Sequence, residues 1–372
     1  MTSNQVIQFI GKCLTLNKYP ERKDEIQQVT ESAGFSWEHV VFNASNQFVL
    51  PAWYIQMKKY GLLSGMSEEL LLHLEELTSL NRERNREILL QVREIATLLN
   101  KNYISPVFLK GTAHLLLGLY NDPAERMVGD IDFLVPDEQI VPAAELVKSL
   151  GFEPLTKYNA GLHSAMKHFP RMVNYNYPAA VEIHREVVNP PDNRLLKGAE
   201  IFAEKQEVKN NPEIFVPSNR HLILHNILNA QINDKSYQKA TTMLRQRYDF
   251  FLLAERENLS VVFENITLFK KEAEAWLATT AFLFDNPKIL NINISIRAKR
   301  HVKWFAFLQK HHRVASFYRH FSYFAWRLSR YIFLPVKAIF DPVVRAGIII
   351  RLTDKTWYGK HIDSYRKYFH PQ

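Results

Sequence analysis

The sequence contains a single cysteine, Cys13, among 372 residues. No disulfide within the chain is therefore possible, which fits a reducing intracellular compartment, and a cysteine-based zinc site is excluded. Glycine is also scarce, with 12 residues, whereas 47% of the residues are hydrophobic. This composition is typical of a globular protein and excludes a disordered one.

Long hydrophobic runs are missing as well. No apolar run approaches the roughly 20 residues that a membrane-spanning helix needs. The nearest candidate, Tyr331 to Phe340, is interrupted by Pro335 and Lys337. The first residues, MTSNQVIQFIGKCL, lack a basic segment followed by a long apolar core, so we expect no signal peptide. These features predict a cytoplasmic protein.

Acidic residues are nearly absent from the end of the chain. Residues 297–372 hold 16 Lys and Arg against three acids, whereas the remainder holds 31 Lys and Arg against 35 acids. This tail mixes cations with aromatic residues at helical spacing, and interruptions are expected near Pro335 and Pro342. Three interpretations are open: the aromatic residues pack inward, the tail lies on an anionic membrane surface, or it binds RNA. The second would place the protein peripherally at the inner membrane face.

The pattern of apolar residues divides the chain into four regions. They are an N-terminal helical region (1–100), an α/β core (101–215), a helical extension (216–295) and a basic aromatic C-terminal helical tail (296–372). Ser67 and Ser218 are predicted N-caps, the first for a helix that begins at Glu68. In the core, short apolar segments alternate with helix-like ones, which indicates a compact α/β module.

The core elements can be placed by residue range. Strands are predicted at 106–109, 130–135, 165–173 and 179–188, and helices at 112–119 and from Pro136 to Gly151, where Gly151 ends the helix. From residue 217 the pattern turns helical, with segments at 221–231, 239–255 and 261–290.

The segment Gly129-Asp130-Ile131-Asp132-Phe133 carries the strongest chemical signal. On a strand, residues two apart point to the same face, so Asp130 and Asp132 project together. Two such close carboxylates repel each other unless a cation lies between them, and oxygen ligands suit Mg²⁺ or Mn²⁺. The alternative is a pair of solvated carboxylates on an edge strand, because D-x-D is a common sequence.

Three further features lie near this pair in the sequence. Glu182 and His184 share one face of the strand Val181-Glu182-Ile183-His184, where Glu182 can complete a carboxylate trio. Lys110, Gly111 and Thr112 form a turn between a strand and a helix, and such a turn lets the backbone approach a phosphate. Arg126, just before the first Asp, is either a phosphate ligand or a solvated loop residue. Taken singly, each also has an ordinary structural explanation.

Three motifs follow one another in this order: FLKGTAHLLLGLY, R-x-x-x-D-I-D-F-L-V and V-E-I-H. In these motifs the sequence resembles the nucleotidyltransferase superfamily of DNA polymerase β type, and in particular its uncharacterised bacterial branch. The resemblance covers residues 105–188, with the R-x-R-Y-D stretch at Arg245 to Asp249 similar to that branch's helical extension. It implies an α/β (α+β) fold in which a small mixed-sheet core is flanked by helical regions. The superfamily's usual Gly-Ser pair is Gly-Thr in this chain.

The resemblance also implies a reaction. Asp130, Asp132 and Glu182 would hold Mg²⁺ or Mn²⁺, with one cation for the attacking hydroxyl and one for a nucleoside triphosphate (NTP) such as ATP. An acceptor hydroxyl would then take the NMP group and pyrophosphate would leave. The remaining residues that the resemblance places at the nucleotide are Lys110, Gly111, Thr112, Arg126 and His184. The acceptor is open: a saccharide, a protein, an RNA and a small molecule all fit.

Two other functions compete with this one. Glycosyltransferases also use D-x-D to bind a nucleotide-sugar through Mn²⁺, but they place several strand–helix units before it, and here the preceding hundred residues are helical. A catalytically silent relative that binds nucleotide is the alternative without enzymatic activity. The presence of all three carboxylates favours an active transferase.

Overall fold

The computed structural model describes residues 1–353 except 191, 210, 265 and 288–292, together with residues 359 and 362. Within these residues, seven strands form one mixed sheet in the order β3-β4-β5-β2-β1-β7-β6. The strands are β1 (Val107–Phe108), β2 (Asp130–Leu134), β3 (Glu153–Pro154), β4 (Met172–Val173), β5 (Ala180–His184), β6 (Gln206–Val208) and β7 (Asn211–Val216). A mixed sheet with helices before and after it confirms the predicted fold class.

The acidic residues of the sheet lie on the parallel pair β2 and β5. Their register places Asp130 beside Ala180 and Asp132 beside Glu182. On its other side β2 pairs with β1, which runs antiparallel to it. The alternate residues Ile131 and Phe133 are buried in the core, so the acidic residues of β2 share the opposite face.

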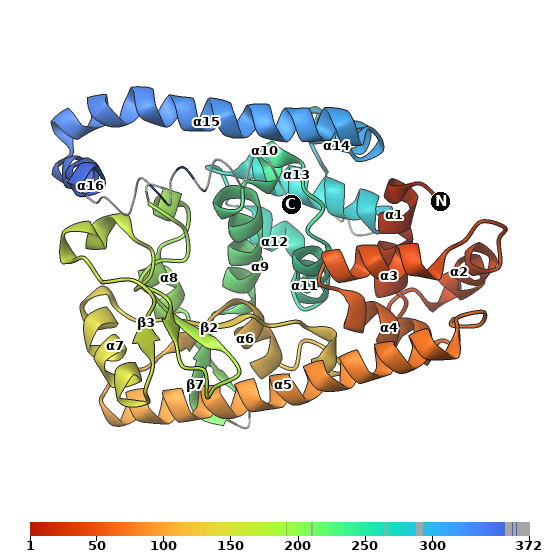
Figure 1. The fold of residues 1–372 in the computed structure, drawn as a ribbon, viewed down its shortest axis with the longest axis horizontal. Helices are drawn as coiled ribbons and strands as arrows, with labels where there is room; N and C mark the ends of the chain where they lie inside the picture. The colour runs from red at the N-terminus through yellow and green to blue at the C-terminus, as the bar shows by residue number, and fades with distance from the viewer. Residues whose placement is uncertain are drawn as a thin grey trace.

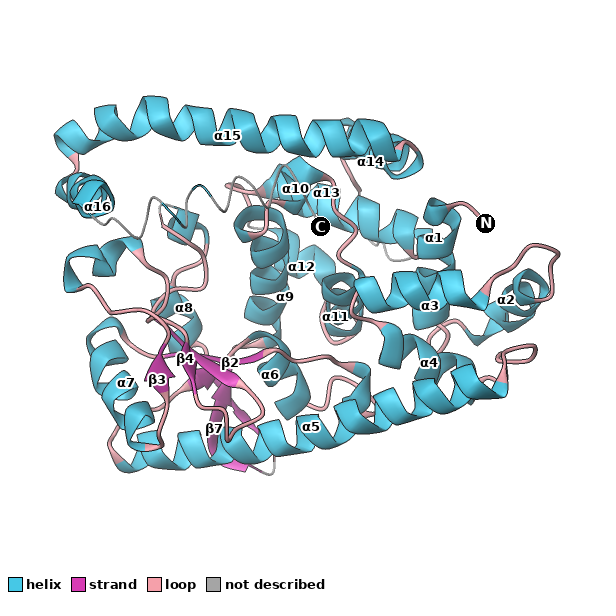
Figure 2. Cartoon of the chain, viewed as in Figure 1, coloured by secondary structure: helices cyan, strands magenta, loops and turns pink. Residues whose placement is uncertain are grey.

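The N-terminal region is helical, as predicted. Its helices are α1 (Ser3–Leu14), α2 (Lys23–Thr30), α3 (Trp37–Asn46), α4 (Leu50–Lys59) and α5 (Glu68–Lys101). The Ser67 hydroxyl accepts a hydrogen bond from the Leu70 N–H and caps α5. This 34-residue helix runs along one edge of the molecule, next to the strands (Figures 1 and 2).

Two buried polar side chains of α5 hold the site strands in position. The Asn85 amide donates to the Arg126 carbonyl at 2.7 Å, in the loop that leads to β2. The Gln91 amide donates to the Ala179 carbonyl at 2.9 Å, directly before β5. Because buried backbone groups need partners, these bonds fix where both strands begin.

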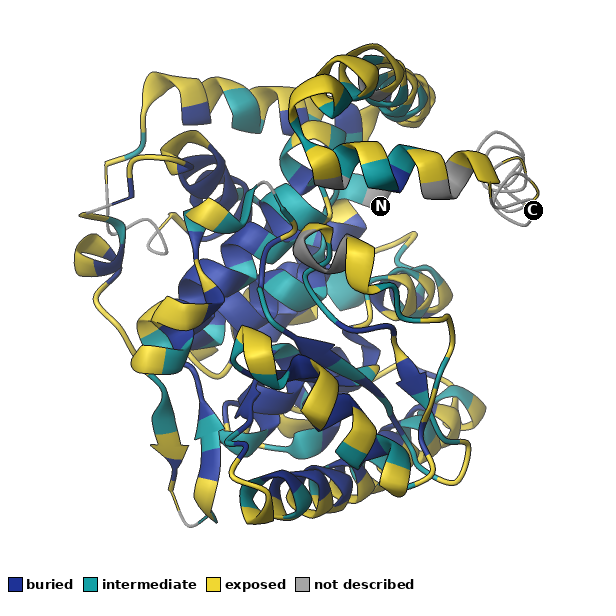
Figure 3. Cartoon of the chain, turned by 90° about the vertical axis from the view of Figure 1, so that its left-hand side faces the viewer, coloured by how far each residue is buried: buried dark blue, intermediate teal, exposed yellow. Residues whose placement is uncertain are grey.

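Helices also cover the rest of the fold. They are α6 (Lys110–Leu116), α7 (Ile140–Ser149), α8 (Gly198–Ala203), α9 (Asn219–Leu228), α10 (Ser236–Lys239), α11 (Leu244–Ala254), α12 (Leu259–Glu264), α13 (Lys270–Leu283), α14 (Ile296–Lys310), α15 (His312–Phe340) and α16 (Pro342–Thr353). As predicted, the Ser218 hydroxyl caps α9 by accepting a hydrogen bond from the His221 N–H. Gly151 follows the end of α7, also as predicted, and has a left-handed φ of +82°. Helix α9 packs against both α6 and α11. Buried residues concentrate around the sheet, and exposed ones dominate the C-terminal helices at the top of the view (Figure 3).

The structure differs from the sequence expectation in several places. Strand β3 and the hairpin of β6 and β7 were not predicted, because their short segments mix charged residues with Pro154 and Pro212. The helix expected over 261–290 is two helices, α12 and α13, and residues 265 and 288–290 lie outside the described part of the chain. The four-region division of the chain stays a prediction.

The interruption expected near Pro335 is wrong, since α15 continues through it to Phe340 and the break comes at Asp341. Proline removes the hydrogen bond to the carbonyl four residues earlier, that of Tyr331. Both residues are exposed, so this part of the helix tolerates a proline. The helix ends instead where Pro342 begins α16, in keeping with the expected second interruption.

Candidate active site

The structure brings Asp132 and Glu182 together across the parallel pair of strands. They are direct neighbours in the register of β2 and β5, so their side chains leave the sheet on the same face. His184, two residues further along β5, joins them. Among the described residues, these three form a group whose potential ligand atoms all lie within 4.8 Å of one another. Glu182 therefore turns toward Asp132 on the neighbouring strand.

His184 is oriented by a contact on each ring nitrogen. Its Nε2 lies 2.8 Å from Asp132 Oδ1 and 3.5 Å from Glu182 Oε2, and its Nδ1 lies 3.2 Å from the Glu186 carbonyl oxygen. Because carboxylate oxygens only accept hydrogen bonds, Nε2 carries a hydrogen in this structure. If a cation displaced that hydrogen, Nδ1–H would donate to the Glu186 carbonyl and the Nε2 lone pair would face the metal. This is the arrangement that metal-binding histidines use, in which the second nitrogen is held by a backbone acceptor.

Lys110 balances the charge of the two acids. Its ammonium forms an ion pair with Asp132 and lies 3.9 Å from Glu182 Oε2. Burial would raise the pKa of Asp132, but Lys110 and His184 outweigh it and hold that pKa well below its usual range. The hydrogen bond from His184 likewise lowers the pKa of Glu182. Both acids are therefore held as carboxylates, the form that binds a cation.

Asp130 lies on the same face of β2 but outside the group of three. Its carboxylate forms an ion pair with Arg171, which comes from the segment before β4. Burial raises the pKa of Asp130, and the Arg171 guanidinium only partly offsets this effect. Because the Arg171 side chain is about half exposed, at 45%, it can be displaced from Asp130 without burying an unpaired cation.

The turn at Lys110, Gly111 and Thr112 begins α6, as the sequence predicts. A Cβ on Gly111 would lie 3.2 Å from a Val128 methyl carbon and 3.4 Å from an Arg126 nitrogen, so the close approach of these segments favours glycine. Thr112 is buried, and its hydroxyl donates to the Asp130 carbonyl at 3.4 Å. In this structure the threonine joins α6 to β2.

Arg126 is not the solvated loop residue that one interpretation expected. It is buried, with one guanidinium nitrogen 2.9 Å from the Asp249 carboxylate and another donating to the Met127 carbonyl at 2.7 Å. Asp249 also accepts from the Tyr120 hydroxyl. Burial would raise the pKa of Asp249, but Arg126 outweighs it and lowers that pKa strongly. Arg126 is thus fixed between the core and the helical extension.

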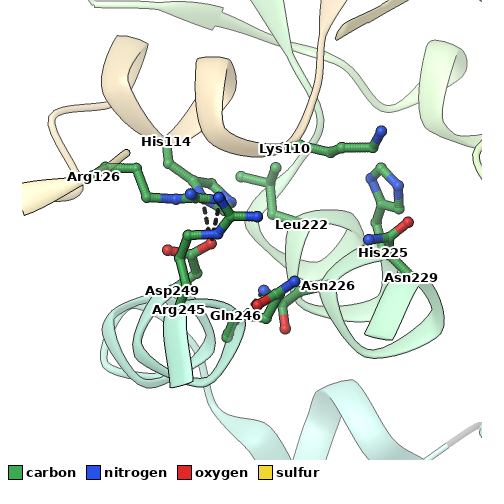
Figure 4. Close-up of a pocket in the computed structure, with 10 residues that line it drawn as sticks. All are labelled: Lys110, His114, Arg126, Leu222, His225, Asn226, Asn229, Arg245, Gln246 and Asp249. Atoms are coloured by element: carbon green, nitrogen blue, oxygen red, sulfur yellow. Dashed lines mark hydrogen bonds and ion pairs between the residues drawn. The ribbon is translucent and has the colours of Figure 1, made fainter. Parts of the chain in front are cut away.

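A cavity lies between α6, α9 and α11, next to the acidic group (Figure 4). Its charged and titratable lining consists of Lys110, His114, Arg126, His225, Arg245 and Asp249. Three permanent cations thus face one carboxylate. Burial lowers the pKa of Arg245 to about 10, and the neighbouring Arg126 contributes to this shift. An anion in the cavity would relieve the repulsion between the two guanidinium groups.

Several polar atoms of this cavity are buried without a hydrogen-bond partner. They include Nε of Arg126, Nε2 of His225 and Nε of Arg245. A buried polar group without a partner costs free energy, on the order of 1–3 kcal/mol, so such groups in a cavity indicate a ligand. The cavity and the acidic group share Lys110, whose ammonium pairs with Asp132.

Residues 33–283, about two thirds of the chain, match a family described as "Uncharacterised nucleotidyltransferase". The chain belongs to this nucleotidyltransferase family. The match spans the whole sheet together with α9, α11 and α13, and it stops before α14. No curated protein was found to match the chain.

The cavity also contains Arg245 and His225, which lie in the helical segment covered by the resemblance but received no role from the sequence. Both come from the helical extension, more than 90 residues after β2, and only the fold brings them to Lys110. Arg171 was also missed, because nothing in its local sequence distinguishes it from a solvated arginine. The R-x-R-Y-D stretch was the one available signal, since it supplies both Arg245 and Asp249.

Proposed function

We propose that this nucleotidyltransferase moves an NMP group from an NTP to an acceptor hydroxyl in a metal-dependent reaction. The observation that carries the proposal is the Asp132, Glu182 and His184 group beside a cationic cavity. An acidic group with imidazole suits a divalent cation, and a cationic cavity suits a polyphosphate. Together they match the two ends of a metal-bound NTP.

The donor atoms of the acidic group support Mg²⁺ or Mn²⁺ as the cofactor. Asp132 and Glu182 supply carboxylate oxygens, which both ions accept, and Asp130 would join them once it leaves Arg171. His184 Nε2 adds a nitrogen donor. When bound, a divalent cation would neutralise phosphate charge and lower the pKa of the acceptor hydroxyl.

The cavity residues support a role in binding the donor phosphates. Lys110, Arg126 and Arg245 would contact the β- and γ-phosphates, and the two arginines would use the Nε–H groups that have no hydrogen-bond partner. Gly111 would keep the turn narrow, and Thr112 would hold that turn against β2. The acceptor oxygen would attack the α-phosphorus, its proton would pass to a site carboxylate or to water, and pyrophosphate would leave.

A transfer assay tests the proposal directly. The purified chain is incubated with each α-labelled NTP, with Mg²⁺ or Mn²⁺, and with cell extract, and the saccharide, protein, RNA, lipid and small-molecule fractions are counted. We expect label in one fraction, lost in Glu182→Gln and retained in Glu138→Gln, a control on an exposed residue near β2. Label that persists in Glu182→Gln would contradict the assignment of the site.

One observation favours a catalytically silent relative as the second candidate. The Lys110 ammonium already pairs with Asp132, as a permanent cation in place of a metal would. Such a protein would bind NTP with unchanged affinity when the divalent cation is chelated, and it would transfer nothing. Calorimetric titration of NTP with and without EDTA separates the two candidates, because the active enzyme loses affinity without the cation. The family match favours an NTP over a nucleotide-sugar as donor.

The reaction is proposed to take place in the cytoplasm. Cys13 is buried and reduced, and the chain has no second cysteine with which it could form a disulfide. A protein without disulfides fits a reducing compartment.

A further inference from the structure

Helix α15 exposes an unusual amount of apolar surface. Its outward side carries Phe317, Phe321, Phe324, Leu328, Ile332 and Ile339, all exposed. Phe317 is 72% exposed and Phe321 59%. The residues follow one another in steps of three or four, with a last step of seven, so they lie along one side of the helix. We call this side the α15 apolar face.

The opposite side of α15 rests on the globule. Ala315 is buried there, and Arg319 donates to the Lys239 carbonyl at 3.1 Å, next to α10. The Trp326 ring is covered by the Lys235 ammonium. The helix lies along one edge of the molecule, opposite α5 (Figure 1). Most aromatic residues of this helix therefore do not pack inward, and that sequence interpretation is wrong for the α15 apolar face.

The charge of this segment is of one sign. Residues 312–340 contain five Lys and Arg and no Asp or Glu, and residues 342–353 add two more arginines and no acid. Arg313 and Lys337, at the two ends of α15, are exposed. Large apolar side chains with cations and without acids are typical of helices that lie in the interface of an anionic bilayer.

We infer that the α15 apolar face binds an anionic membrane surface. With 29 residues the helix is about 44 Å long, and it would lie parallel to the bilayer with its aromatic side chains among the acyl chains. None of the helices in the described part of the chain has the length and apolar character that crossing a bilayer requires. The family match ends at residue 283, so this surface is separate from the nucleotidyltransferase core.

Two other occupants fit the charges and the shape less well. Against a second copy of the chain, Arg313 beside this face would meet no acid of the other α15, because residues 312–340 contain no Asp or Glu. RNA binds through aromatic rings on which bases stack. Half of the named residues, Leu328, Ile332 and Ile339, are aliphatic and offer no ring.

Vesicle flotation of the full chain tests the inference. We expect binding to phosphatidylcholine vesicles that contain about 30% phosphatidylglycerol, weak binding to pure phosphatidylcholine, and a decrease in about 0.5 M NaCl. Phe317→Ser with Phe321→Ser should weaken binding at least about tenfold, because two apolar anchors are lost. Arg313→Gln should weaken it about fivefold.

A matched control separates this face from exposed apolar residues in general. Phe42→Ser with Leu80→Ser removes two side chains that are 65% and 64% exposed on α3 and α5, and binding should not change. Circular dichroism and the melting temperature confirm that each variant is folded. Flotation needs no nucleotide, so the failure of the proposed transfer reaction and the failure of this inference give different results.

Four results would overturn the inference. The first is equal binding to neutral and anionic vesicles, and the second is unchanged binding of the Phe317 and Phe321 double variant. The third is a sedimentation experiment in which the wild-type chain is a dimer and the double variant is a monomer, while neither protein binds vesicles. An RNA gel shift that depends on the same two residues, without flotation, would assign the α15 apolar face to RNA instead.

Discussion

The buried ion pair of Arg126 with Asp249 can be tested by measuring how its removal changes the stability of the protein. The nitrogen–oxygen distance is 2.9 Å, and the side chains are 8% and 2% exposed. Asp249→Asn keeps the shape of the side chain but leaves the Arg126 guanidinium buried without its counter-charge and close to Arg245. Breaking a buried pair in this way costs about 3–5 kcal/mol.

The measurement is the free energy of unfolding from urea denaturation, followed by circular dichroism. Asp137→Asn serves as control: the Asp137 side chain is 52% exposed, so its pair with Arg185 should contribute less than about 1 kcal/mol. Combining Asp249→Asn with Arg126→Met removes both charges, and the amide oxygen still accepts from the Tyr120 hydroxyl. We expect the double variant to recover most of the lost stability. If Asp249→Asn stays within about 1 kcal/mol of wild type, the cavity charges are solvated and the reasoning is refuted.

The remaining predictions concern catalysis, nucleotide binding and pH. Asp132→Asn and Glu182→Gln should each lower transfer of labelled nucleotide at least about a hundredfold, because each removes a metal donor, and near wild-type transfer would contradict the site. Arg245→Ala should weaken NTP binding about tenfold or more in calorimetric titrations, since it removes a charge-assisted hydrogen bond, while exposed Arg220→Ala should not. Burial holds the pKa of His225 well below its ordinary value. As the pH falls, His225 is therefore protonated in the unfolded chain before it is protonated in the folded protein. Stability should then fall as pH drops below about 6.5, by up to about 1.4 kcal/mol per pH unit, and His225→Gln should flatten this profile in urea titrations.

The sequence predicted the acidic strands well because local periodicity determines which residues share a face. The period of two in β2 and β5 places Asp132 and Glu182 on matching faces, and the parallel pairing then aligns them. It did not predict the ion pairs around them. Whether Asp130 meets a metal or Arg171 depends on a loop 41 residues away, and such distances carry no periodic signal.

The C-terminal tail shows a second limit of sequence reasoning. An apolar stripe at helical spacing looks the same whether it packs on a core or faces outward, because periodicity reports one side of a helix and not its neighbour. In α14, Phe305 and Leu308 are buried, whereas Phe317 and Phe321 of α15 are exposed. The charge pattern does not separate the two helices either, since neither α14 nor α15 contains an Asp or Glu.

Lys110 connects the two halves of the site and is held there under strain. Its backbone has φ +51°, a left-handed conformation that costs a non-glycine residue about 1–2 kcal/mol. The strain persists because the ammonium pairs with Asp132 on one side, while the cavity with Arg126 and Arg245 opens on the other. A divalent cation on Asp132 would repel this ammonium, and the nearest place for it is among the phosphates proposed for the cavity. The same lysine can therefore balance the acids before the donor binds and the phosphates afterwards.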